Sequence, residues 1–160
     1  ALCDLLIEEN LAVLLVFHHG DDGLIGDFLA HECYLMGTDG IYFPDGRVHP
    51  RMYGSAPRVL GPCVRDAGLF SLEVAVAKLS DRPARRFGCA ERGQVREGWS
   101  ADLVVFDEET VADTATYADP HQLPIGIDHV VVNGTPVIAG GVAVDDLTDP
   151  LPGRSLTFQP

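Results

Sequence analysis

The chain has 160 residues, of which 46% are apolar and 22% are charged, and its net charge is −13. A chain of this length can form one domain with a buried core. The acidic balance, with Lys78 as the single lysine beside ten arginines, argues against binding to nucleic acid or to an anionic membrane surface.

The cysteines and the chain start restrict the class of protein further. Cys3, Cys33, Cys63 and Cys89 are about thirty residues apart and form no CxxC or Cys/His cluster, which excludes a zinc knuckle and a disulfide scaffold. We expect buried free thiols and a cytoplasmic location. No apolar run reaches the roughly 18 residues of a membrane helix. The first residues, ALCDLLIEEN, look like the end of a helix in a longer protein.

Residues 1–55 form the first predicted part, in which strand and helix alternate. Residues 11–17 (LAVLLVF) are a continuous apolar run, typical of a strand buried on both faces of a parallel sheet. Residues 22–31 predict a helix, which Asp21 or Asp22 could cap. Residues 34–38 predict a second strand parallel to the first, because strand, helix and strand in this spacing form a βαβ unit.

Residues 56–90 form the second part and are predicted to be helical. Pro57 can begin one helix, and Ser71 can cap another that carries Leu72 and Leu79 on its apolar face. A short third helix is expected from Asp81, with Pro83 in its first turn, and Gly88 is expected to stop it.

Residues 91–160 form the third part, in which the apolar pattern becomes strand-like. Strands are predicted over residues 102–106, 128–132 and 135–139, in a sheet separate from the first two strands. Asn133-Gly134 between two β-branched runs is a strong hairpin signal. Pro136 indicates an edge strand or a bulge, and Gly140-Gly141 indicates a further turn.

Five segments resemble the carboxyl-terminal part of the amidohydrolase superfamily, and most closely the family of D-aminoacylases, or N-acyl-D-amino-acid deacylases. They are GTDG at 37–40, HPRMYGSAPRVLGPCVRD at 49–66, SLEVAVAKLSDRPARRFG at 71–88, RGQVREGWSADLVVFDEETVAD at 92–113 and DPHQLPIGIDHVVVNGTPV at 119–137. The fourth segment is shared by many amidohydrolases. The fifth is much narrower to the deacylases, and HPRxYG followed by DPHQxPxGI and VNG is a strong signal for that family.

The resemblance implies an α/β fragment. It would hold the last strands and helices of a metal-dependent (β/α)8 barrel, followed by part of a small β-sandwich domain. Residues 1–55 would be the end of the barrel with an active-site loop, residues 56–90 the closing helices, and residues 91–160 part of the β-sandwich. The working residues of such barrels lie at the carboxyl ends of the strands, which is where Asp39 is expected.

Asp39 is the candidate catalytic residue. The resemblance implies that it takes a proton from metal-bound water as a general base and returns that proton to the leaving amine as a general acid. Asp39 is also the candidate metal ligand of this chain. From the residues alone, the favoured interpretation is that Asp39 caps a turn or the following helix, as aspartate often does.

The resemblance implies zinc in the full-length enzyme, but the family's histidine ligands have no counterpart here. His18 and His19 are adjacent, so in an extended chain they would point to opposite faces. Catalytic zinc needs about three protein ligands, and Asp39 would be one. We therefore expect no tightly bound metal in this chain alone, and we expect the amino-terminal part of the same protein to supply the remaining ligands.

His49, Arg51 and Tyr53 are the candidate substrate-binding residues. They alternate along HPRMYG and would share a face if the segment were extended. The guanidinium of Arg51 could hold the carboxylate of an N-acyl-D-amino acid in a bidentate pair. The alternative is that the segment only fixes a loop over the barrel mouth. Trp99 and His121 are expected to be structural.

The predicted function is thus hydrolysis of N-acyl-D-amino acids to a D-amino acid and a carboxylate by a zinc-dependent enzyme. One alternative is a cyclic-amide hydrolase related to hydantoinases or dihydroorotases. The other is a non-catalytic structural fragment, which applies if the chain is complete as given.

Overall fold

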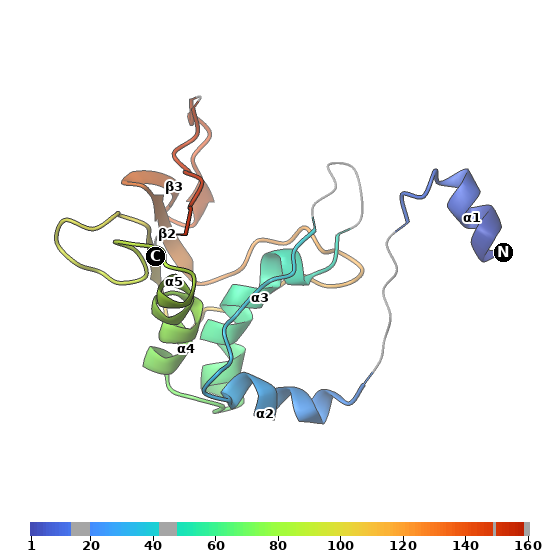
Figure 1. The fold of residues 1–160 in the computed structure, drawn as a ribbon, viewed down its shortest axis with the longest axis horizontal. Coiled ribbons are helices and arrows are strands. Elements are labelled where there is room, and N and C mark those ends of the chain that lie inside the picture. The colour runs from blue at the N-terminus through green and yellow to red at the C-terminus, as the bar shows by residue number, and fades with distance from the viewer. Residues whose placement is uncertain (14–19, 42–47, 149, 159–160) are drawn as a thin grey trace.

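A computed structural model describes residues 1–160 except 14–19, 42–47, 149 and 159–160. In this described part of the chain, five α-helices, two short helical turns of other types and four strands follow one another (Figure 1). The predicted strand at 11–17 and the pair His18-His19 lie largely or wholly outside the described residues. None of the helices in the described part is long and apolar enough to cross a membrane.

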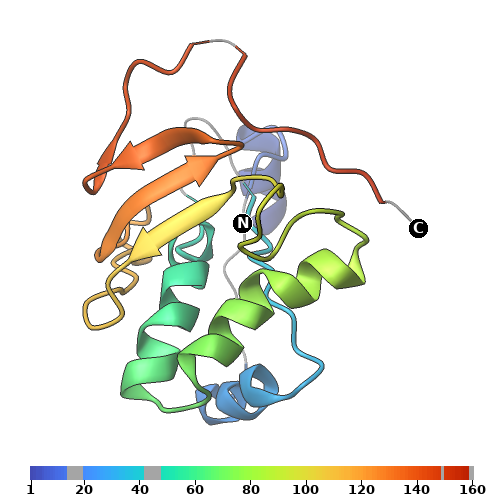
Figure 2. The ribbon, with the colours of Figure 1, turned by 90° about the vertical axis from the view of Figure 1, so that its left-hand side faces the viewer.

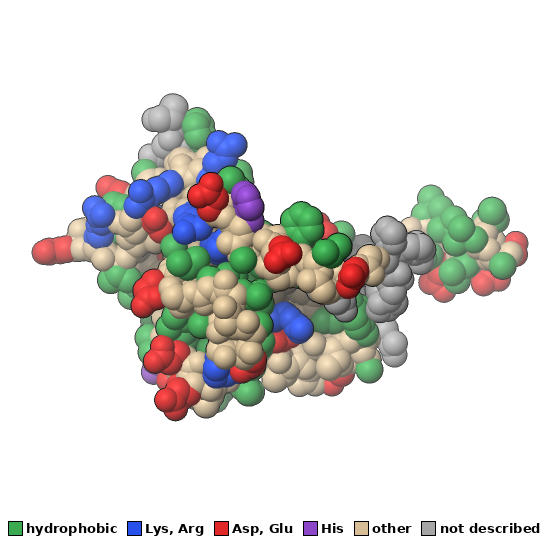
Figure 3. Space-filling model, turned by 90° about the horizontal axis from the view of Figure 1, so that it is seen from below, with side chains coloured by type: hydrophobic (Ala, Val, Ile, Leu, Met, Phe, Trp, Pro, Cys, Tyr) green, Lys and Arg blue, Asp and Glu red, His purple; other side chains and the backbone are tan. Residues whose placement is uncertain are grey.

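The amino-terminal elements are short and little buried. Helix α1 (Leu2–Glu8) stands apart from the rest of the chain, beyond the grey residues, and carries apolar side chains on its surface (Figures 1 and 3). The helix predicted at 22–31 is confirmed as a 3-10 turn, η1 (Asp22–Leu24), that continues into α2 (Ile25–Ala30). Asp21 contributes to its start, because Oδ1 accepts a hydrogen bond of 2.9 Å from the Gly23 amide.

The strand predicted at 34–38 is wrong. These residues have no regular secondary structure, and Met36 N donates a single hydrogen bond of 3.3 Å to the carbonyl oxygen of Lys78. A parallel strand needs neighbouring strands to pair its amides and carbonyls. Among the described residues, no strand pairs with residues 34–38. Their apolar sequence alone is therefore not enough to make them a strand.

Helix α3 (Arg51–Leu60) begins earlier than the sequence indicated. The prediction that Pro57 starts this helix is wrong, because Pro57 lies inside it and Pro50 occupies the position before its first residue. Pro50 has φ −52° and ψ −28°, which is already the helical region, so its ring sets the direction in which the helix grows. A π-helical turn, η2 (Pro62–Asp66), follows directly after Gly61.

Helices α4 (Leu72–Leu79) and α5 (Asp81–Arg86) confirm the predicted starts at Ser71 and Asp81. The Ser71 side chain accepts a hydrogen bond of 3.4 Å from the Val74 amide and so caps α4. Gly88 follows α5 with a φ of +60°, which glycine adopts without strain, in agreement with the predicted stop.

Lys78 on α4 is fully buried, which is unusual for a lysine. Its Nζ donates a hydrogen bond of 2.6 Å to the carbonyl oxygen of His31 and lies 5.3 Å and 5.7 Å from the ring centres of Tyr34 and Phe70. Burial lowers the pKa of this ammonium, and the nearby positive charge of Arg82 lowers it further. The two rings and the carbonyl thus compensate in part for the lost hydration of the charge.

The sheet consists of β1 (Leu103–Phe106), β2 (Ile127–Val132), β3 (Thr135–Ala139) and β4 (Val142–Ala143), all antiparallel and in sequence order. Three of these strands and the turn at Asn133-Gly134 were predicted. The register between β2 and β3 shifts next to the pair Val131 and Pro136, which confirms the predicted bulge.

The sheet lies over α3 and α4, and the main core forms between these layers (Figure 2). Val59, Leu60, Ala75 and Val111 are its buried centre. Gly61 lets the chain after β1 approach closely, since a Cβ atom there would lie 1.8 Å from the carbonyl oxygen of Val111. The join between helices and sheet therefore depends on a residue without a side chain.

All four cysteines are free, but only Cys63 is buried. The expectation of buried thiols is wrong for Cys3 and Cys33, which are exposed, and Cys89 is half-buried. For Cys3 the reason is local, because α1 buries none of its residues.

Candidate active site

Asp39 lies in a tight turn between two glycines. Its φ is +46°, a left-handed conformation that few residues other than glycine, asparagine and aspartate adopt. The Oγ1 atom of Thr38 accepts the Gly40 amide hydrogen bond at 3.2 Å. The turn is thus capped by Thr38, and the carboxylate of Asp39 remains available for another contact.

That contact is an ion pair with Arg51. The Oδ2 atom of Asp39 lies 2.8 Å from Nη2 of Arg51, and the carboxylate is 78% exposed while the guanidinium side chain is 34% exposed. The Nε atom of Arg51 is buried and has no hydrogen-bond partner among the described residues. Nε of Arg51 is thus a donor that pairs with no described residue and is closed to solvent.

The HPRMYG segment is helical from Arg51 onward, so the prediction of one shared face for His49, Arg51 and Tyr53 is wrong. In a helix, residues two apart point in different directions, whereas residues four apart share a face. Arg51 accordingly contacts Asp39. His49 and Tyr53 instead face the loop that precedes β2.

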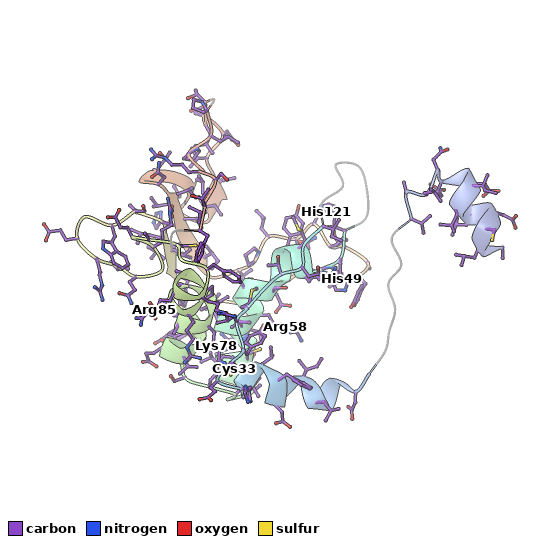
Figure 4. All side chains as sticks on the ribbon, viewed as in Figure 1. Cys33, His49, Arg58, Lys78, Arg85 and His121 are labelled. Carbon is purple, nitrogen blue, oxygen red and sulfur yellow. The ribbon has the colours of Figure 1, made fainter. Side chains whose placement is uncertain are left out.

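Two histidine–tyrosine pairs join that loop to the start of α3. The Tyr117 hydroxyl lies 3.2 Å from Nε2 of His49, and Nδ1 of His121 lies 3.3 Å from the Tyr53 hydroxyl. Both ring pairs are edge-on, with centres 5.0 Å and 5.6 Å apart. Figure 4 labels His49 and His121, which both lie near the end of α3 that carries Arg51.

Sequence reasoning missed Tyr117, and it assigned His121 to a structural role only. The signal was present as a mirrored spacing. HPRMY places histidine and tyrosine four residues apart, and YADPH at 117–121 places tyrosine and histidine four residues apart in the reverse order. Each histidine of one segment therefore meets a tyrosine of the other.

The described residues do not form a metal site by themselves. No group of three histidine, cysteine, aspartate or glutamate side chains in the described part of the chain could hold a metal ion. Asp39 can offer one oxygen ligand, but its described partner is a cation. The donor set of the described residues thus falls short of the three protein ligands of catalytic zinc.

The profile of the amidohydrolase family matches residues 33–138 of this chain. The chain is 50% identical over 117 residues to the D-aminoacylase of Alcaligenes xylosoxydans xylosoxydans, and 48% identical over 117 residues to the N-acyl-D-glutamate deacylase of the same organism. Each alignment covers 73% of this chain and 24% of the relative. The chain therefore spans about a quarter of the length of the curated relatives it matches.

Solved structures agree with this similarity. A D-aminoacylase with a binuclear metal centre superimposes with a TM-score of 0.77 at 46% identity, covering 86% of this chain and 28% of that chain. The N-acyl-D-glutamate deacylase of Bordetella bronchiseptica, in complex with zinc and a phosphonate mimic of the tetrahedral intermediate, gives a TM-score of 0.76 at 44% identity over 85% of this chain and 27% of that chain. Most of this chain thus superimposes on a part of each of these two solved structures.

Proposed function

Because the chain belongs to the amidohydrolase family, we propose that it is the carboxyl-terminal portion of an enzyme that hydrolyses N-acyl-D-amino acids. The observation that carries the proposal is the ion pair of 2.8 Å between Asp39 and Arg51. It brings an acid–base group and a carboxylate-binding group to one place, and the substrate needs both. The proposed products are a D-amino acid and the carboxylate of the acyl group.

Asp39 is proposed to be the general base and then the general acid. As a base it takes a proton from the water that attacks the amide carbon, and a tetrahedral intermediate forms. As an acid it gives that proton to the amine nitrogen when the C–N bond breaks. The high exposure of its carboxylate and the cap supplied by Thr38 leave Asp39 accessible for both transfers.

Arg51 is proposed to hold the free carboxylate of the substrate. A guanidinium presents several N–H groups in a planar fork, so it can bind two carboxylates on different edges. In the structure one edge binds Asp39, and the buried Nε has no partner among the described residues. Because Nε is buried, a substrate carboxylate would approach the exposed part of the guanidinium, next to Asp39.

Zinc does not fit the described residues alone, so we assign none of its chemistry to this chain. Bound zinc would lower the pKa of its water in such an enzyme. The proposal places the remaining ligands in the part of the relatives that this chain does not span. It likewise treats residues 1–55 as the end of a (β/α)8 barrel, residues 56–90 as its closing helices and residues 91–160 as part of a small β-sandwich.

The test is a chimera. The matched segment of the D-aminoacylase of Alcaligenes xylosoxydans xylosoxydans is replaced by the corresponding residues of this chain, and zinc content and hydrolysis of N-acetyl-D-methionine are measured. We expect turnover that Asp39→Asn removes. A folded, zinc-loaded chimera that hydrolyses dihydrouracil instead would favour the cyclic-amide alternative. A folded, zinc-loaded chimera with no turnover of either substrate would favour the non-catalytic alternative.

A further inference from the structure

The loop between β1 and β2 is braced along its length. Ala112 and Ile125 form an isolated antiparallel bridge at its base, and the Thr114 hydroxyl donates a hydrogen bond of 2.7 Å to the Leu123 carbonyl. At its tip the Thr116 amide donates to the Asp119 carbonyl at 3.0 Å, and the Asp119 amide donates to the Thr116 hydroxyl oxygen, also at 3.0 Å. Such a loop presents its side chains in fixed positions.

The same loop is fastened to α3. Arg58 Nη1 donates a hydrogen bond of 2.9 Å to Oδ2 of Asp113. Gly54 faces the same aspartate, since a Cβ atom there would lie 3.1 Å from the Asp113 Cβ. Figure 1 shows the loop running beside α3 toward the end of the helix that carries Arg51.

At that end the loop meets the segment that carries Arg51, the proposed substrate-binding residue. Tyr117 contacts His49, and His121 contacts Tyr53, with the same separation of 68 residues in each pair. The two contacts therefore align the segment 49–53 with the segment 117–121, so that each residue in contact meets the residue 68 positions further along the chain. An error in the position of the loop would displace both pairs together.

We propose that Tyr117 and His121 are positioning residues that hold the His49 and Tyr53 rings at the start of α3, where Nδ1 of His49 accepts a hydrogen bond of 3.1 Å from the amide of Arg51, and so fix Arg51 for an N-acyl-D-amino acid. This inference rests on the proposed function. A tyrosine or histidine on the surface samples several rotamers, and ordering it when the substrate binds costs entropy. A second ring and a hydrogen bond fix each side chain beforehand, so the site is preorganised. The specificity of the site would then depend on a loop that is remote from Arg51 in the sequence.

The kinetic test uses the chimera with Tyr117→Phe, His121→Phe and, as a control, Leu123→Ala. Tyr117→Phe keeps the ring and removes the hydroxyl that meets His49, and His121→Phe keeps a ring and removes the nitrogen that meets Tyr53. We expect each to raise KM, and Kd for a phosphonate inhibitor, by roughly threefold to tenfold with little change in kcat. Leu123 is on the same loop with its side chain 57% exposed, and its variant should leave both constants unchanged.

A double variant separates positioning from general damage to the fold. Tyr53→Phe with His121→Phe should be no worse than the poorer single variant, because both remove the same contact. The exchange of Tyr53→His with His121→Tyr restores a pair and should recover part of the affinity. Independent, additive effects, or equal losses in kcat and kcat/KM for all variants, would overturn the inference.

The pairing itself is measured without activity, by NMR of the 160-residue chain. Tyr117→Phe should shift the ring proton resonances of His49 and leave those of His121 in place, whereas Tyr53→Phe should do the reverse. Resonances that do not respond in this crossed manner would overturn the inference, whatever the chimera does. An inactive, folded and zinc-loaded chimera would overturn the proposed function instead.

Discussion

The carboxylate of Asp39 and the guanidinium of Arg51 are 2.8 Å apart, with Asp39 in a left-handed turn and Arg51 in the first turn of α3. Two charged groups of opposite sign thus lie at the point where two segments converge. The proposed roles of the two residues differ, however. Proton transfer would affect turnover, and carboxylate binding would affect substrate affinity, so separate variants distinguish them.

Asp39→Asn keeps the shape of the side chain and removes its ability to carry a proton. General acid–base catalysis contributes roughly 10² to 10⁴ in rate, so kcat of the chimera should fall by about that factor. Folding should change little, because the amide is close to isosteric. Steady-state kinetics of the variant, with its zinc content measured in parallel, tests the expected fall in kcat. Near-native kcat at full metal occupancy would mean that Asp39 is only a turn residue.

Arg51→Lys should have the opposite kinetic effect. Lysine keeps the positive charge, but its ammonium cannot form the planar, bidentate contact of a guanidinium. A lost charge-assisted hydrogen bond is worth about 1.5 to 3 kcal/mol, which corresponds to a rise in KM of roughly tenfold or more. The same steady-state assay measures the KM of this variant. The role assigned to Arg51 is wrong if KM stays constant and kcat alone decreases.

The sequence predicted those elements whose signals are local. Asn133-Gly134 defines its hairpin because both turn residues favour positive φ, and they have φ values of +48° and +83°. The cap of α4 is equally local, because the Ser71 side chain accepts its hydrogen bond from the amide of Val74, three residues further along the chain. Residues 34–38 failed for the opposite reason, since a parallel strand depends on neighbours that are distant in the sequence.

The site was predicted in its residues but not in its geometry. Asp39 and Arg51 were both named, yet their ion pair was not, because alternation was taken to mean an extended segment. Pro50 already has helical φ and ψ, so the segment from Arg51 onward is a helix. In a helix, side chains two residues apart point in different directions, and Arg51 therefore contacts Asp39 whereas Tyr53 contacts His121. The contact between Tyr117 and His49 depends on tertiary packing, which local propensity does not determine.

Lys78 provides a prediction about stability. Lys78→Met fills the same volume without a charge, so the free energy of unfolding should change by less than about 1.5 kcal/mol. Lys78→Ala leaves a cavity among Tyr34 and Phe70 and should cost roughly 2 to 5 kcal/mol. Chemical denaturation of both variants measures the difference. Equal losses would mean that the ammonium contact with His31 dominates over packing.

The same lysine predicts a pH dependence. Its pKa is lowered in the folded chain, so between the folded and unfolded pKa values the unfolded chain binds more protons. The contribution of Lys78 to stability should therefore rise with pH through that window, up to the usual lysine value near about 10.4. Lys78→Met removes this titration. The stability difference between wild type and Lys78→Met should thus shift in favour of wild type at alkaline pH, as measured by denaturation from pH 7 upward.

The 160-residue chain by itself should bind no zinc tightly and should not hydrolyse N-acetyl-D-methionine. Its described residues offer Asp39 but no group of three ligands. Zinc content after dialysis and turnover above a zinc-only blank are the two measurements. Turnover by the purified chain would contradict the division of the site between this chain and the part of the relatives that it does not span.

Gly61→Ala tests the join between α3 and the loop that reaches the site. The added Cβ would lie 1.8 Å from the Val111 carbonyl oxygen, which also accepts a hydrogen bond of 3.2 Å from Nη1 of Arg65. A backbone atom cannot rotate away, so the variant should lose roughly 1 to 3 kcal/mol of stability or more. Gly153→Ala is the control, because its Cβ would meet nothing within 4 Å.

If the loop holds Tyr117 and His121 in place, Gly61→Ala in the chimera should also raise KM at temperatures where the protein remains folded, while Gly153→Ala should not. Loss of stability without a change in KM would show that the substrate site does not depend on how the loop is seated on α3.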